Sequence, residues 1–187
     1  MLRTPKSSWF YNGPVDANAE WRIRYRGTAG FTLQFGQTTF VLDPYVTRPG
    51  LIETGFSRLR PNEALVKRIF RRADAVMVGH AHHDHILDAP VLCQQIGADF
   101  VGSPDAVHVA RAAGVAEEKL ITTTGSPFQL HGADVRGVPS RHGRVYDRVP
   151  LPGHILEPPP WPPRVWDLRH GMVLNWHVHM NGLNIAH

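Results

Sequence analysis

The sequence predicts an α/β fold, a sandwich in which helices pack against mixed β-sheets. Segments with strand character occupy both ends of the chain, whereas the region from about residue 62 to residue 123 alternates between helical and strand patterns. The length of 187 residues, 42% of them hydrophobic, suits one domain and excludes a wholly disordered chain. We expect residues 1–19 to form an N-terminal tail and residues 20–187 to form a single domain.

Three strands are expected at the start of this domain. Residues 21–26 alternate apolar and charged side chains, which is typical of a half-exposed strand. Residues 31–35 and 38–42 are rich in aromatic and β-branched side chains and are separated by a turn at Gly36, which predicts a β-hairpin. The second strand of this hairpin leads directly into Asp43.

Three short strands alternate with three helices in the middle of the chain. The strands are expected at residues 75–78, 100–101 and 120–123. The helices are expected at residues 63–72, from Asp88 to about Gly97, and from Ser103 to Gly114. Asn62, Asp88 and Ser103 stand where the helices begin, and each of these side chains can cap a helix N-terminus. Strands that are apolar throughout, such as residues 75–78, are typical of a sheet covered on both faces.

A second hairpin and a proline-rich loop are expected after the last helix. Residues 128–130 and 134–138 have strand character and flank Gly132, which predicts the hairpin. Seven prolines lie between Pro150 and Pro163. Because that number is too high for a helix or a strand, this segment is expected to be a stiff surface loop.

The last two strands are expected to form a third hairpin. Residues 172–178 and 183–186 flank the pair Asn181 and Gly182, which favours a two-residue turn. The chain ends at His187, within the second strand of this hairpin. We therefore expect the fold to be incomplete at its C-terminus.

The charge of the chain is uneven. Residues 1–72 carry 12 basic and 5 acidic side chains, whereas residues 73–187 carry 8 basic and 11 acidic side chains. The basic region can attract anions, but its arginines are not interleaved with stacking aromatic residues, so nucleic acid is not expected as a partner. The sequence has neither an apolar run of the roughly 18–20 residues that a membrane span needs nor a signal peptide, so we expect a cytoplasmic protein. The single cysteine, Cys93, is expected in the core.

A cluster of potential metal ligands follows the strand at residues 75–78. In an extended backbone His80 and His82 point to the same side, so they can hold one ion together. The turn into the next helix then brings Asp84 and His85 towards a second ion, while His83 faces away. Mixed imidazole and carboxylate ligands suit zinc, with iron or manganese as alternatives.

Three parts of the sequence resemble the metallo-β-lactamase-fold hydrolases, in particular their lactonase-like and phospholipase-D-like branch. The run His80-Ala-His82-His-Asp84-His85 resembles the signature of this superfamily. Gly27-Thr-Ala-Gly-Phe with Val41-Leu-Asp43-Pro-Tyr resembles the opening strands, whose terminal aspartate lies under the metal site. Val138-Pro-Ser-Arg-His142-Gly resembles the segment that supplies a third histidine to the first metal. The resemblance implies an αβ/βα sandwich with mixed sheets.

The resemblance also implies a site with two metal ions. His80, His82 and His142 would hold the first ion. Asp84 and His85 would help to hold the second, with Asp84 as the catalytic carboxylate. The family's bridging acid and its final histidine would be expected after His187, where this chain ends. The sequence therefore predicts two zinc ions only for an intact site.

The predicted function is that of a metal-dependent hydrolase that uses a metal-bound hydroxide on a phosphodiester. Arg141 and Arg144 are candidate phosphate clamps, because a guanidinium group matches two phosphate oxygens. The expected substrate is a small or lipid-like anion, and the proline-rich loop is expected to wall its cleft. Two alternatives stay open: a hydrolase of lactones or other esters, and a non-catalytic protein that retains a metal site.

Overall fold

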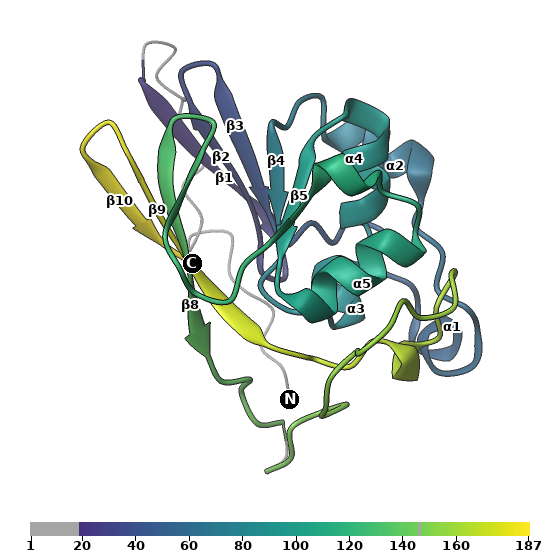
Figure 1. Cartoon of the computed structure of the whole chain (residues 1–187). Coiled ribbons are helices and arrows are strands. Elements are labelled where there is room, and N and C mark those ends of the chain that lie inside the picture. Colours follow the sequence, from purple (N-terminus) through teal and green to yellow (C-terminus); the bar gives the residue numbers. More distant parts are fainter. Residues whose placement is uncertain (1–18, 146) are drawn as a thin grey trace.

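The computed structural model describes residues 19–145 and 147–187. Two β-sheets pack face to face, and the helices cover the outer face of the first sheet (Figure 1). The predicted α/β sandwich is therefore confirmed, with one mixed sheet and one antiparallel sheet. The predicted N-terminal tail, apart from residue 19, lies outside the described residues.

The first sheet is mixed and has six strands. Its order along the sheet follows the sequence: β1 (Trp21–Gly27), β2 (Gly30–Phe35), β3 (Thr38–Leu42), β4 (Ala75–Met77), β5 (Asp99–Gly102) and β6 (Leu120–Thr122). Strands β1 to β3 pair antiparallel, as the predicted hairpin requires, and β3 to β6 pair parallel. Parallel neighbours need long crossover connections, and the helices of this chain supply them.

The second sheet is antiparallel and has four strands in the order β10-β9-β8-β7. Its members are β7 (Phe128–Leu130), β8 (Ala133–Ser140), β9 (Val173–Met180) and β10 (Leu183–Ala186). Asn181 and Gly182 connect the last two strands with φ values of 49° and 76°. Positive φ at both positions is what a two-residue turn of this twist needs, so the predicted hairpin is confirmed.

Five helices and two 3-10 turns complete the described part of the chain. They are α1 (Leu51–Phe56), α2 (Glu63–Ile69), α3 (His83–Ile86), α4 (Ala89–Ile96), α5 (Pro104–Ala112), η2 (Glu117–Lys119) and η3 (Val165–Asp167). None of the helices in these described residues is long and apolar enough to pass through a bilayer.

Two apolar layers hold the sheets and helices together. Val41 and Val76 point towards the helices, whereas their neighbours Phe40, Leu42 and Met77 point towards the second sheet. All five side chains are at most 1% exposed. Strands β3 and β4 are thus covered on both faces, which explains why the sequence is apolar throughout there.

The helices differ from their predicted form in two details. Helix α2 ends at Ile69 rather than at residue 72, because Phe70 leaves the helical conformation and packs into the core. Asp88 stands at the N-terminus of α4, but its carboxylate does not cap that helix. It accepts hydrogen bonds from the backbone N–H groups of Val46 and Thr47 instead, at 2.6 and 2.8 Å. The expected burial of Cys93 is confirmed.

The proline-rich loop lies against the end of the molecule that carries α1 and α3 (Figure 1). The N–H group of Leu59 donates to the carbonyl oxygen of Pro163 at 2.7 Å, and the Arg58 guanidinium donates to that of Pro162 at 2.7 Å. These bonds hold the loop to the segment after α1. The loop then leads through His170 into β9.

Candidate metal centre

The histidine motif begins where β4 ends, and Gly79 positions it. The Gly79 N–H group donates to the Asp43 carboxylate at 2.7 Å, and the Gly79 carbonyl accepts from the N–H group of Leu174 at 2.8 Å. A side chain at this position would meet both the Asp43 carboxylate and the Leu174 carbonyl at 3.1 Å. The end of β4 is therefore fixed between β3 and β9 by contacts that leave little room for a β-carbon.

His80, His82 and His142 lie together. One ring nitrogen from each is within 4.8 Å of the other two. His80 and His82 come from the segment after β4, and Nε2 of His80 lies 3.1 Å from Nδ1 of His82. His142 comes from the segment after β8, in the other sheet, and its ring centroid is 4.9 and 4.7 Å from those of the other two. The structure thus brings together the three residues expected to hold the first ion.

The chemistry of this cluster fits a metal ion. Nε2 of His82 is buried and, within the part of the chain that the structure describes, makes no hydrogen bond of normal geometry. Nδ1–H of His142 donates to the carbonyl oxygen of Gly143 at 2.6 Å, which leaves Nε2 with a free lone pair. Three imidazoles, one of them oriented by a backbone carbonyl, form a donor set typical of zinc and related ions.

The electrostatics keep the rings of His80 and His82 neutral. Burial, followed by the neighbouring histidines, lowers the pKa of His80 to about 2. Burial and His142 lower the pKa of His82 to about 4, although Asp84 and the Leu151 backbone partly oppose that shift. A neutral imidazole is the form that binds a metal, so both side chains are ready to do so at neutral pH.

Asp84 and His85 lie beside this cluster, but not in the group of three. The His85 ring lies 3.8 Å from the His80 ring, and its Nδ1–H donates to the second oxygen of Asp43 at 2.9 Å. Although burial lowers the pKa of His85, this hydrogen bond and the charges of Asp43 and Asp84 outweigh it and raise the pKa. The Asp84 carboxylate is 37% exposed and lies 3.8 Å from Nε2 of His85. His83 packs its edge against Tyr45 instead.

A fourth histidine adjoins the cluster and was missed by the sequence reasoning. The His170 ring stacks on that of His142, with centroids 5.8 Å apart and planes 19° apart, and its centroid is 5.9 Å from that of His82. The His170 carbonyl accepts from the N–H group of Ala81 at 3.1 Å, which ties it to the motif. His170 stands alone after the proline-rich loop, so no spacing pattern in the sequence marks it.

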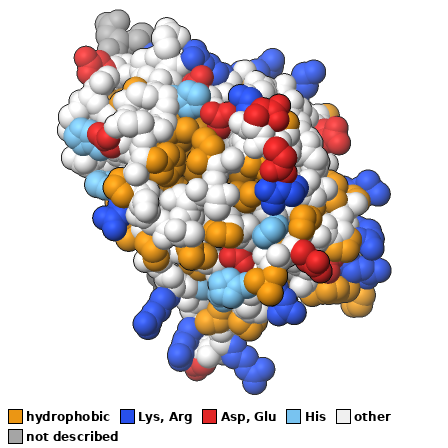
Figure 2. Space-filling model, viewed as in Figure 1, with side chains coloured by type: hydrophobic (Ala, Val, Ile, Leu, Met, Phe, Trp, Pro, Cys, Tyr) orange, Lys and Arg blue, Asp and Glu red, His pale blue; other side chains and the backbone are white. Residues whose placement is uncertain are grey.

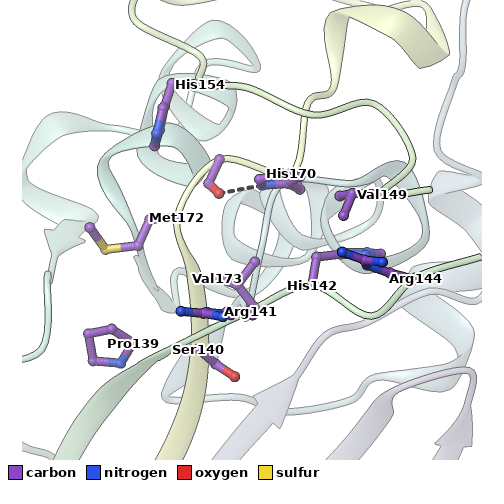
Figure 3. Close-up of a pocket in the computed structure, with 11 residues that line it drawn as sticks. Pro139, Ser140, Arg141, His142, Arg144, Val149, His154, His170, Met172 and Val173 are labelled. Carbon is purple, nitrogen blue, oxygen red and sulfur yellow. Dashed lines mark hydrogen bonds between the residues drawn. The ribbon is translucent and has the colours of Figure 1, made fainter. Parts of the chain in front are cut away.

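Two cavities open beside the cluster. One, of about 440 Å³, contains Arg141, His142, Arg144, His154 and His170 in its wall (Figure 3). The other, of about 310 Å³, is lined among others by Asp43, His80, His85, His142 and His187. In Figure 2 several basic side chains project from the lower end of the molecule, where the segment after β8 lies. The predicted clamp residues Arg141 and Arg144 therefore line the same cavity as His142, a candidate metal-binding residue.

Comparison with known proteins identifies related sequences. The family described as a beta-lactamase superfamily domain matches residues 38–156. A UPF0173 metal-dependent hydrolase of Methanopyrus kandleri is 26% identical over 121 residues, which cover 65% of this chain and 47% of the relative. Another UPF0173 metal-dependent hydrolase, from Polynucleobacter asymbioticus, is 25% identical over 178 residues, which cover 89% of this chain and 58% of the relative. The chain spans about half the length of the curated relatives it matches.

Solved structures share the fold. Igni18, a metallo hydrolase of Ignicoccus hospitalis, superposes with a TM-score of 0.57 and 19% identity, over 88% of this chain and 58% of that one. CmlA, a diiron β-hydroxylase of Streptomyces venezuelae, superposes with a TM-score of 0.57 and 16% identity, over 89% of this chain and 29% of CmlA. At these identities the likeness concerns the fold alone, and the two proteins carry different chemistry on it.

Proposed function

Since this chain belongs to the metallo-β-lactamase superfamily, whose domain matches residues 38–156, we propose that it is a metal-dependent hydrolase that cleaves a phosphodiester. One observation carries the proposal: the cluster of three histidines, whose ligand atoms lie within 4.8 Å of one another, adjoins a cavity that contains two arginines. The named relatives are metal-dependent hydrolases, which supports the reaction type but leaves the substrate open.

We assign zinc to the cluster of His80, His82 and His142. Asp84 and His85 are the candidates for holding a second ion, because the His85 ring lies next to that of His80. A bound zinc ion supplies Lewis-acid activation of water and of a phosphoryl oxygen. Asp43 orients this part of the site, since one of its oxygens holds Gly79 and the other holds His85.

The two arginines are the reason for choosing a phosphodiester over a neutral ester. Arg141 and Arg144 flank His142 in the sequence and lie in the wall of the same cavity (Figure 3). A guanidinium group binds two phosphate oxygens at once and keeps its positive charge at every working pH. An anionic diester held by them would lie next to the histidine cluster.

The test replaces both arginines by glutamine in the zinc-loaded protein. We expect kcat/KM for bis(p-nitrophenyl) phosphate to fall by about 100-fold or more, because the variant loses two charge-assisted hydrogen bonds that contribute on the order of 1.5–3 kcal/mol each. Arg24→Gln, on the exposed face of β1, is the matched control and should leave the rate unchanged.

The other outcomes separate the alternatives. Unchanged diesterase activity in the double variant would remove the clamp. Hydrolysis of lactones with no diesterase activity would favour an ester hydrolase. Stoichiometric zinc without hydrolysis of either substrate would favour a non-catalytic metal-binding protein.

A further inference from the structure

A third cavity, of about 340 Å³, lies beyond the one that contains the arginines. We call it the ring subsite. Its apolar wall consists of Leu156, Pro158, Pro159, Pro160 and Trp166. Glu157, Asp167 and Arg169 complete its rim, together with His154 and Ile155.

We propose that the ring subsite binds a flat aromatic group at the far end of the substrate's ester chain. This inference rests on the proposed function, because it takes the phosphate of the same substrate to lie near Arg141 and Arg144. It names the substrate class: a phosphodiester in which a linker of several bonds separates an aromatic ring from the phosphorus.

His154 connects the two cavities. Among the described residues, it is the one that the walls of the arginine cavity and the ring subsite have in common. In Figure 3 it lies at the end of the arginine cavity away from His142 and Arg144. We therefore place the far end of an extended substrate, beyond His154, in the ring subsite. A cavity of about 440 Å³ separates this end from the histidine cluster, and for this reason the ring needs a linker.

A buried carboxylate fixes this junction. Asp105, in the first turn of α5, is 4% exposed. Its oxygens accept from the N–H groups of Ile155 and Met172 at 2.6 and 2.9 Å, and from Nδ1 of His154 at 3.2 and 3.3 Å. Asp105 thus holds Met172 in the wall of the arginine cavity, Ile155 in the wall of the ring subsite, and His154, which belongs to both. Gly171, with φ of +63°, lies against it so closely that a β-carbon there would come within 2.3 Å of Asp105.

The walls of the ring subsite suit an aromatic group. Trp166 is 47% exposed, and the Arg164 guanidinium packs on its ring with 5.2 Å to the centroid. The Asp167 carboxylate accepts a hydrogen bond from the backbone N–H group of Arg164 at 2.7 Å, which fixes the 3-10 turn η3 that carries Trp166. Leu156 is 84% exposed and offers apolar surface that a ligand would cover. Proline rings and an indole present flat faces, against which a planar ring packs well.

The experiment measures binding, so it does not depend on turnover. Two phosphate monoesters with the same linker, 4-phenylbutyl phosphate and n-butyl phosphate, are titrated calorimetrically into the zinc-loaded protein. We expect the phenyl compound to bind about tenfold more tightly, because its aromatic ring leaves water and packs against the partly exposed apolar wall of the ring subsite. Trp166→Ala should reduce this preference to about twofold or less.

The matched control is Trp21→Ala. Trp21 is 40% exposed on β1 and lines neither cavity, so this variant should retain the full preference. Equal affinity of the wild-type protein for the two phosphates, a preference that survives Trp166→Ala, or no binding of either phosphate would each overturn the ring subsite. A preference that depends on Trp166 in a protein that hydrolyses no phosphodiester would retain the subsite and refute the proposed function.

Discussion

Two buried histidines, His80 and His82, follow one short strand and form the centre of the candidate site. His80 and His82 are 6% and 5% exposed, although an imidazole is a polar group that normally needs partners when it is buried. The two rings contact each other, and among the residues that the structure describes Nε2 of His82 finds no hydrogen bond of normal geometry. A buried ring nitrogen of this kind is tolerated most readily when it binds a metal ion.

The burial of these rings predicts how the metal-free protein responds to pH. The folded-state pKa values of His80 and His82 are about 2 and about 4, against 6.5 for an ordinary histidine. Between these values the unfolded chain binds more protons than the folded chain, so folding becomes less favourable as the pH falls. The free energy of unfolding should therefore be highest above pH 6.5 and fall by roughly 1–3 kcal/mol between pH 7 and pH 5.

Urea unfolding in the presence of a chelator measures this dependence. The double variant His80→Gln/His82→Gln lacks both titrating groups and should show a shallower decline over the same range. Parallel curves for the variant and the wild-type protein would mean that other groups control the acid response.

At the scale of elements, buried carboxylates connect segments that are distant in the sequence. Asp88 is completely buried at the start of α4, where burial raises its pKa although the Thr47 and Val46 groups favour the charged form. It accepts from two backbone N–H groups and from the Thr47 hydroxyl. This one side chain therefore anchors the segment after β3 to the helix that covers the sheet.

Replacing Asp88 by alanine should destabilise the protein by about 2–4 kcal/mol. The variant leaves two backbone donors and a hydroxyl without their acceptor in a buried position. The denaturant midpoint of unfolding checks the prediction. Asp134→Ala, on the exposed face of β8, is the control and should change stability by no more than about 0.5 kcal/mol. A loss of similar size in both variants would contradict the role of Asp88.

Local patterns predicted the elements that depend on local physics. Asn181 and Gly182 adopt the positive φ values that their sequence favours, and Asn62 caps α2 by accepting from the N–H group of Leu65 at 3.0 Å. Helix α1 was not predicted, because it has no buried residue and so no apolar face that repeats along the sequence. Its Leu51 is 93% exposed.

The candidate site was predictable only in part. His80 and His82 follow from spacing after a strand, whereas His142 entered through the resemblance to a known superfamily. His170 and Asp105 were missed because their roles arise from contacts across the fold: Asp105 holds Met172, 67 residues further along the chain. Sequence periodicity reports neighbours along one element, and it carries no signal for a contact of this kind.

At the scale of the whole molecule, the histidine cluster joins the two halves of the sandwich. His80 and His82 follow β4 of the first sheet, and His142 follows β8 of the second. An ion held by all three would bind only when both sheets are in place. Binding that is specific to the folded state stabilises it by an amount that grows with the ligand concentration.

Removal of the metal should therefore lower the thermal stability of the protein. At a free zinc concentration about 100 times the dissociation constant, the loss on chelation should be about 2.7 kcal/mol. Differential scanning calorimetry with and without a chelator measures it. His82→Ala should be insensitive to the chelator, whereas His177→Ala, an exposed histidine of β9, should respond like the wild-type protein. No change of the wild-type protein on chelation would argue against a metal that connects the sheets.

The separation of these three histidines along the chain also determines when each becomes available to a metal ion during synthesis. His142 is synthesised 60 residues after His82, and the region between them contains α4, β5, α5, β6 and the whole second hairpin, β7 and β8. A nascent chain that has just passed β4 can offer a metal only two of the three imidazoles. We therefore expect the full affinity for the ion to appear only once β8 has folded against the first sheet, so that metal uptake reports the completion of the sandwich rather than its beginning.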